Sequence, residues 1–290
     1  MLLSSHLIAM RPLFLSLTLL LACSIALPQA LTPSFPAFDQ WRAAVLAGDA
    51  NALASLYSPT AEAKVGGSDA KEVPLPEEIA FWSSLKSKGL VNLSAEISQQ
   101  QNPREDVHVL VQQVTLTFKP GVTPQHQYVI LSQAWGLTDN RWRVVFSAHS
   151  VPARLRQPIE RKDIYSASAN PAQEIAEAVH SASASRKRIL LVFGGNWCFD
   201  CHVLDEAFHS AEIAPTLNKS FLVVHIDIGE MNRNLNVAKQ YGVPIDRGVP
   251  AIAVLDSQGK LLYSQKQGEF ERARSMAPED ILAFLHHWQP

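Results

Sequence analysis

The most constraining feature of this 290-residue chain is a pair of cysteines, three residues apart, between a strand-like run and a helix-like run. The apolar run RILLVFGG ends at residue 195, the motif NWCFDC follows, and CHVLDEAF has the spacing of a helix. A cysteine at a helix N-terminus faces unpaired amides and the positive end of the macrodipole, which lower the pKa of a thiol. Spacing of i to i+3 places both sulfurs on one helical face. We therefore expect Cys198 to act as a nucleophile and Cys201 to resolve the mixed disulfide.

The same stretch has three other interpretations. It contains C-x-x-C-H, the attachment signature of c-type haem, with His202 as the proximal ligand. The pair also suits a zinc site or a purely structural disulfide. We favour redox exchange, and expect no cofactor and no metal. A haem-attachment motif does not require a tryptophan before its first cysteine, and Trp197 stands there in this chain.

The N-terminus has the features of an export signal. Arg11 precedes the apolar run PLFLSLTLLLACSIAL, which is short for a transmembrane helix and is followed by small residues. We predict a signal peptide over residues 1–30, cleaved after Ala26 or Ala30, and a periplasmic or otherwise exported protein. LLAC resembles a lipobox, so a lipid anchor on Cys23 is an alternative, and an uncleaved membrane anchor is another.

Cysteine usage and composition narrow the class further. Of three cysteines, Cys23 is removed with the signal or carries lipid, so the mature protein keeps only Cys198 and Cys201. Two cysteines this close together build no disulfide framework, and they are better suited to reaction than to bracing. The chain is long enough for two domains, is 47% apolar and 18% charged, and has a formal charge of −2. We expect no nucleic-acid partner, because no dense basic patch is visible.

The first domain is expected over residues 36–150. Helical spacing starts at Phe38, is interrupted by AGDA, and resumes as far as Tyr57, and another helix follows within EVPLPEEIAFWSSLKSKGL. Three strand-like runs come next, VHVLVQQVTLTF, HQYVILSQAWG and RWRVVFSAH. Helices followed by a meander predict an α+β domain, with the helices packed on one curved sheet.

This segment resembles the SnoaL-like branch of the nuclear transport factor 2-like superfamily. The resemblance lies in FDQWRAAVLAGDANALASLYSPTAE and in the closing strand RWRVVFSAH. It implies a cone-shaped α+β fold around a pocket, which members use for catalysis, binding or dimerisation, so we expect a homodimer through this domain. Asp106 and His108, two apart on a predicted strand, are a candidate acid–base pair, although simple alternation on an exposed face gives the same pattern.

The second domain is expected over residues 171–290, after a polar, Pro-bearing linker over 151–170. Its predicted order is helix, strand, the cysteine motif, helix, strand and helix, followed by two strands and a final helix. DSQGK, between those last two strands, is a hairpin turn signal. A βαβ unit followed by a hairpin and a closing helix is an α/β thioredoxin-fold arrangement.

Two landmarks carry a resemblance to the thioredoxin-like family over this whole segment. They are NWCFDC, with Trp197 ahead of the first cysteine, and GVPAIAVLD, preceded by YGV. The resemblance implies thiol–disulfide exchange with protein substrates. It also implies a cis peptide bond between Val249 and Pro250 that brings the Val249 backbone alongside the cysteines.

The sequence departs from thioredoxin at two places. Thioredoxins carry a buried Asp on the strand before the motif, and Val192 stands there in this chain. Asp200 is a candidate replacement as proton acceptor for Cys201, although its charge opposes thiolate formation. The loop over residues 241–250 is longer and contains PIDR.

The sequence thus predicts an exported thiol–disulfide oxidoreductase that acts on protein thiols and disulfides, supplied by a membrane electron donor if it acts as a reductant. The competing hypothesis is a ligand- or protein-binding protein, in which the thioredoxin-like domain is a redox-sensitive interaction module.

Overall fold

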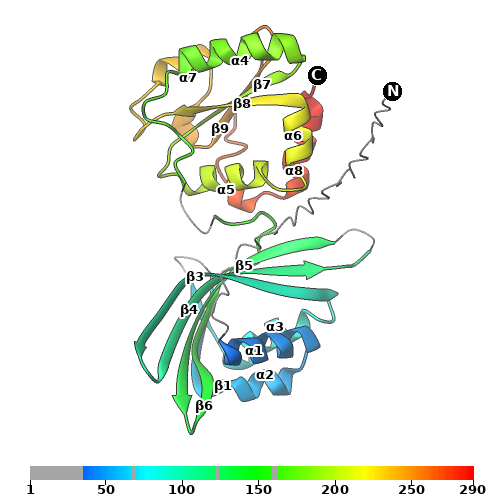
Figure 1. Cartoon of the computed structure of the whole chain (residues 1–290), viewed down its shortest axis with the longest axis vertical. Coiled ribbons are helices and arrows are strands. Elements are labelled where there is room, and N and C mark those ends of the chain that lie inside the picture. The colour runs from blue at the N-terminus through cyan, green and yellow to red at the C-terminus, as the bar shows by residue number, and fades with distance from the viewer. Residues whose placement is uncertain (1–34, 67–69, 122–123, 159–161) are drawn as a thin grey trace, which may run out of the picture. The chain divides into compact units, whose positions relative to one another are not determined.

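The computed structural model of the chain describes residues 35–66, 70–121, 124–158 and 162–290 (Figure 1). The predicted signal peptide, its cleavage sites and Cys23 lie outside these ranges. Within them, no helix has both the length and the apolar character needed to cross a membrane.

The first domain is an open six-stranded sheet with three helices. The helices are α1 (Pro36–Ala47), α2 (Ala50–Leu56) and α3 (Leu75–Ser84). The strands are β1 (Tyr57–Val65), β2 (Lys71–Val73), β3 (Leu90–Arg104), β4 (Val107–Phe118), β5 (Gln125–Thr138) and β6 (Arg141–His149). Their order is β2-β1-β6-β5-β4-β3, and all neighbours are antiparallel except β1 and β6. The predicted α+β class is confirmed, and the three predicted strands are β4, β5 and β6.

The break between α1 and α2 follows from local chemistry. Gly48 ends α1 in the left-handed conformation, with φ of 70°, which glycine adopts without steric cost. Asp49 then caps α2, since its side chain accepts hydrogen bonds from the amides of Asn51 and Ala52. The AGDA tetrapeptide therefore stops one helix and starts the next, as the sequence predicted.

The three helices lie inside the curve of the sheet (Figure 1). The core beneath them contains the fully buried side chains of Trp41, Trp82 and Trp135. The buried carboxylate of Glu78 accepts hydrogen bonds from Trp82 Nε1 at 2.8 Å and from Ser147 Oγ at 2.7 Å. Much of the concave side is therefore filled by the domain's own aromatic and polar side chains.

The predicted acid–base pair on β4 is wrong. Asp106 lies in the turn before β4, and its carboxylate pairs with Arg104 at 3.1 Å and not with His108. The imidazole of His108 packs against the rings of Phe35 and Trp142. A two-residue spacing places side chains on one face only where both residues lie in the strand.

The second domain is a four-stranded sheet covered by helices on both faces. Its strands are β7 (Arg188–Gly194), β8 (Phe221–Asp227), β9 (Ala251–Leu255) and β10 (Leu261–Ser264). Its α-helices are α4 (Pro171–Ser185), α5 (Phe199–Phe208), α6 (Ala214–Ser220), α7 (Leu235–Gln240) and α8 (Pro278–Trp288), with short 3₁₀ turns at Ile245–Arg247 and Ala273–Ser275. The strand order is β10-β9-β7-β8, with only β7 and β8 parallel. The predicted α/β thioredoxin-type class is confirmed.

Strand β7 is central, and its side chains supply both halves of the core. Ile189, Leu191 and Phe193 pack with residues of α4 and α7, whereas Leu190 and Val192 pack with residues of α5, α6 and α8. An uninterrupted apolar run is expected for a strand buried on both faces. This packing fixes the carboxyl end of β7, where the cysteine motif begins.

Candidate functional site

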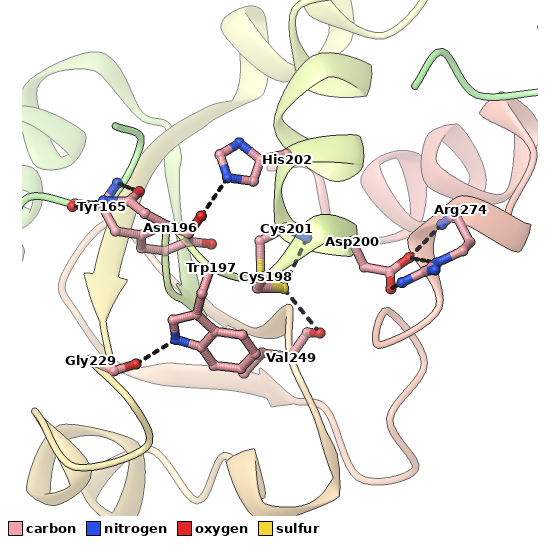
Figure 2. Close-up of a disulfide and its surroundings, with 10 residues drawn as sticks. All are labelled: Tyr165, Asn196, Trp197, Cys198, Asp200, Cys201, His202, Gly229, Val249 and Arg274. Carbon is pink, nitrogen blue, oxygen red and sulfur yellow. Dashed lines mark hydrogen bonds and ion pairs between the residues drawn. A yellow bond between two sulfur atoms is a disulfide. The ribbon is translucent and has the colours of Figure 1, made fainter. Parts of the chain in front are cut away.

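The two cysteines lie at the junction between β7 and α5 and are joined by a disulfide (Figure 2). Cys198 is the N-cap residue of α5, and Cys201 lies in the first turn of that helix. Their Cα atoms are 5.3 Å apart. The strand-to-helix junction predicted from the sequence thus places both sulfurs where a helix begins.

Sγ of Cys198 lies between a hydrogen-bond donor, which suits a thiolate, and a hydrogen-bond acceptor, which suits a thiol. It accepts a hydrogen bond from the backbone amide of Cys201 at 3.1 Å, in the position of a capping side chain. It also lies 3.4 Å from the carbonyl oxygen of Val249, whose peptide bond to Pro250 is cis. After reduction, the helix N-terminus favours the thiolate of Cys198, and the carbonyl can accept a hydrogen bond from its thiol.

Trp197 forms an apolar rim beside the disulfide. Its side chain is 41% exposed, unusual for an aromatic residue of this size, and its Nε1 donates a hydrogen bond to the carbonyl of Gly229 at 2.7 Å. The indole is therefore held in place while one face stays open to solvent. An exposed, fixed aromatic ring next to a reactive bond can contact a substrate.

Asp200 is buried and its carboxylate is bound by Arg274. The guanidinium Nε of Arg274 donates to both carboxylate oxygens at 2.9 and 3.0 Å, its Nη2 also donates, and its backbone amide adds a fourth hydrogen bond at 2.9 Å. Hydrogen bonding to Asp200 raises the pKa of Arg274. Arg274 therefore compensates the negative charge that Asp200 brings to the first turn of α5. The carboxylate of Asp200 is hydrogen-bonded to Arg274, and Figure 2 shows it directed away from Cys201.

His202 is buried and held by the motif itself. One of its ring nitrogens, Nε2, lies 2.8 Å from the carbonyl oxygen of Asn196. Coordination of haem iron would require this imidazole to leave its buried position and its backbone partner. Among the residues that the structure describes, no cluster of three or more His, Cys, Asp or Glu side chains is arranged as a metal site.

Tyr165 and Asn196 form a second support that the sequence analysis did not find. The side chain of Asn196 exchanges two hydrogen bonds with the backbone of Tyr165, and Tyr165 itself is buried in the core of the second domain. Figure 2 shows both residues on one side of the disulfide, with Asp200 and Arg274 on the other. The only sequence signal was an Ile-Tyr pair within an otherwise polar segment, which we assigned to the linker.

The predicted site residues meet at one end of the second sheet. Those that the sequence singled out are Trp197, Cys198, Asp200, Cys201, Val249 and Pro250. Those that it missed are Arg274, which follows the last strand, and the pair of Tyr165 and Asn196. Together they form a dithiol/disulfide site on a rigid strand–helix junction, able to exchange disulfides with an incoming thiol.

Solved structures that match a further part of the chain do so at low identity. An NTF2-like protein of unknown function in nutrient uptake from Rhodospirillum rubrum ATCC 11170 is 18% identical, covering 40% of this chain and 94% of its own, with a TM-score of 0.31. A ketosteroid isomerase-like protein from Erwinia carotovora atroseptica SCRI1043 is 14% identical over 40% of this chain and 90% of its own, with the same TM-score. No curated protein matches the chain.

The second domain is similar to proteins of known type. The thioredoxin-like family model matches residues 170–257. The crystal structure of a disulphide isomerase from Xylella fastidiosa Temecula1 is 36% identical, and the match covers 44% of this chain and 98% of that one, with a TM-score of 0.42. Through this domain the chain belongs to the thioredoxin-like family, and its Cys198–Cys201 pair is that of a thiol–disulfide oxidoreductase.

Proposed function

We propose that the chain is an exported thiol–disulfide oxidoreductase for protein substrates, with Cys198 as the attacking residue and Cys201 as the resolving residue. The observation that carries this assignment is the disulfide itself, formed between the N-cap residue of α5 and a residue one turn later. Only Cys198 occupies the cap, where the amide of Cys201 donates to its sulfur at 3.1 Å. That difference gives the two thiols different roles.

The exchange reaction balances without a cofactor. The thiolate of Cys198 attacks one sulfur of a substrate disulfide, forming a mixed disulfide and releasing the other substrate sulfur as a thiolate. The thiolate of Cys201 then attacks Sγ of Cys198, which releases the second substrate thiolate and forms the Cys198–Cys201 disulfide. Two electrons pass from the enzyme dithiol to the substrate, and the same steps in reverse oxidise a substrate dithiol.

Export is supported by the sequence pattern of residues 1–30 and by the presence of only two cysteines beyond it. A disulfide formed under oxidising conditions persists outside the cytoplasm. In that compartment a reducing role requires an electron supply across the membrane, so we include a membrane thiol reductant among the partners. Mass spectrometry of the protein purified from a bacterial envelope distinguishes cleavage after Ala26, cleavage after Ala30 and lipidation of Cys23.

We assign the first domain to dimerisation. Among the described residues, strand β3 ends the six-stranded sheet and pairs with β4 alone, so its outer edge offers backbone groups to a second copy. Sedimentation of the mature protein tests this role. A dimer supports the assignment, and a monomer at high micromolar concentration contradicts it.

Trapping of mixed disulfides tests the catalytic assignment. In a Cys201→Ser variant the second step is blocked, so substrate proteins accumulate as disulfide-linked adducts of Cys198 that thiol reductants release. The matched Cys198→Ser variant should trap none. If the two variants behave alike, the division of roles is wrong. If neither variant traps a substrate and ligand binding is unaffected by both substitutions, the competing hypothesis of a binding protein takes its place.

A further inference from the structure

The hydroxyl group of Tyr165 is buried without a hydrogen-bond partner. The residue is 1% exposed, and its Oη makes no hydrogen bond with any residue that the structure describes. A buried hydroxyl without a partner costs about 1–3 kcal/mol. Such a group in a folded protein calls for an explanation, because nearly all buried polar groups are paired.

The position of the Tyr165 hydroxyl relative to Cys201 explains why it has no partner in the disulfide form. A methyl group built on Gly194 would overlap Oη of Tyr165 and would lie 2.7 Å from Sγ of Cys201. The two atoms therefore border the same methyl-sized space above the α-carbon of Gly194. The absence of a side chain at Gly194 is what allows the phenol to approach the sulfur.

Neither Val192 nor Asp200 supplies Cys201 with a hydrogen-bond donor once the disulfide opens. Cys201 is only 2% exposed, so water does not solvate its sulfur well. Val192 is apolar, and the carboxylate of Asp200 is bound by Arg274. A buried thiolate needs a hydrogen-bond donor, because burial in apolar surroundings disfavours the charged form.

We propose that the hydroxyl of Tyr165 donates a hydrogen bond to the sulfur of Cys201 when the disulfide is opened. This inference rests on the proposed redox function and assigns the resolving thiol its supporting group. The partner that the hydroxyl lacks in the disulfide form is the thiolate that exists only in the reduced form and in the mixed disulfide.

An incoming thiolate attacks Sγ of Cys198, the bond between Cys198 and Cys201 breaks, and its electron pair leaves on Sγ of Cys201. Tyr165 keeps its proton throughout and shares it with that sulfur. A second thiolate then attacks the incoming sulfur of the mixed disulfide and releases Cys198 as a thiolate. The two incoming thiols thereby become one disulfide, and two electrons have passed to the enzyme.

The surroundings of Tyr165 suit a donor that does not ionise. Burial raises the pKa of the phenol, and the nearby carboxylates of Asp205 and Asp227 raise it further. The ring is fixed by the two backbone hydrogen bonds to Asn196 and by an edge contact with His225, with ring centroids 5.3 Å apart. A hydroxyl that stays neutral and fixed in place can donate a hydrogen bond to an anion without adding a second negative charge beside it.

The test compares Tyr165→Phe with the wild type and with Tyr263→Phe in equilibria with reduced and oxidised glutathione. Tyr263 is a matched control, since it lies on β10 and its hydroxyl donates a hydrogen bond to Glu269 at 3.2 Å. Loss of the hydrogen bond to Cys201 should shift the equilibrium of Tyr165→Phe toward the disulfide by roughly tenfold or more, and should slow its reduction. Tyr263→Phe should match the wild type.

Three results overturn the inference. If the wild type exchanges with glutathione and Tyr165→Phe has the same equilibrium constant, the hydroxyl has no role, although the proposed function stands. If the wild type does not exchange at all, both the proposed function and this inference fail. A shift of the same size in Tyr263→Phe also contradicts a specific role for Tyr165.

A measurement on the unaltered protein covers the case in which Tyr165→Phe does not fold. The chain has five tyrosines, so labelling with ¹³Cζ-tyrosine gives five resonances, which single Tyr→Phe variants at the other four positions assign by elimination. Reduction of the disulfide should change the Cζ shift of Tyr165 more than that of any other tyrosine, because its hydroxyl gains a partner. An unchanged Tyr165 resonance contradicts the inference.

Discussion

The side-chain amide of Asn196 holds the backbone of Tyr165 at both of its polar groups. Nδ2 of Asn196 donates to the carbonyl of Tyr165 at 2.8 Å, and its Oδ1 accepts from the amide of Tyr165 at 2.9 Å. Asn196 lies two residues before Cys198, whereas Tyr165 lies ahead of the first helix of the domain. The cysteine motif therefore positions a distant segment against its own resolving thiol.

Replacing Asn196 by alanine should release this segment. We expect the free energy of unfolding to fall by about 1–3 kcal/mol, because two partly buried hydrogen bonds are lost. Hydrogen–deuterium exchange should accelerate over residues 162–168 and change little in α4. Asn236→Ala on the exposed surface of α7 is the control and should leave both quantities unchanged. Slow exchange over 162–168 in Asn196→Ala would show that other contacts hold the segment.

The ion pair between Asp200 and Arg274 predicts opposite effects on the Cys198 thiol. Removing the cation in Arg274→Gln leaves an uncompensated carboxylate near the helix N-terminus, so the pKa of Cys198 should rise. Removing the anion in Asp200→Asn should lower it. Each shift should be on the order of half a unit or more. Thiolate absorbance against pH, measured in a Cys201→Ser background, reports Cys198 alone, and shifts of the same sign in both variants would contradict this account.

Trp197 predicts a difference between large and small substrates. Its exposed indole lies beside the disulfide, so a protein substrate should contact it and a small disulfide should not. In Trp197→Ala, we expect exchange with a reduced, unfolded protein to slow by roughly fivefold, in line with loss of one interface aromatic residue. Exchange with glutathione should change less than about twofold. Equal slowing of both reactions would indicate that the indole acts on the cysteines instead of the substrate.

Protonation of His225 should lower the stability of the folded protein on acidification. Burial lowers its pKa below the ordinary value of 6.5, although the carboxylate of Asp205 acts in the opposite direction. The unfolded chain therefore binds the proton more readily, so the free energy of unfolding should fall as the pH drops below 6.5 and level off below the folded-state pKa. His225→Phe keeps an aromatic ring against Tyr165 and should flatten this region. Urea unfolding of both proteins between pH 7.5 and 5 measures it, and parallel curves would exclude His225 as the cause.

Local patterns in the sequence predicted the parts of the fold whose burial is periodic. The apolar run of β7, the AGDA break and the hairpin turn before β10 are encoded within a few residues, and each was located correctly. Strand β3 was missed because most of its residues are exposed, and β1 was missed because few of its residues are buried, so both sequences alternate weakly. Asp106 was assigned to the strand although it lies one residue before β4 begins, and sequence patterns do not locate strand boundaries that accurately.

The site was predicted where its chemistry is local and missed where it depends on tertiary contacts. Trp197, Cys198 and Cys201 are contiguous, and Val249 belongs to a motif of its own. Arg274 lies 74 residues from Asp200 in the sequence, and nothing near it distinguishes it from other arginines. Tyr165 lies in a polar segment, and only the folded chain brings its hydroxyl to Gly194.

The most direct test of the central claim is an equilibrium titration of the mature protein in glutathione buffers, quenched with acid and followed by alkylation and mass measurement. The account predicts one two-electron transition in which Cys198 and Cys201 gain alkyl groups together, and none in Cys198→Ser. If the pair stays oxidised at every buffer ratio, or if the two cysteines titrate independently, Cys198 and Cys201 are not a redox-active pair and the proposed function is wrong.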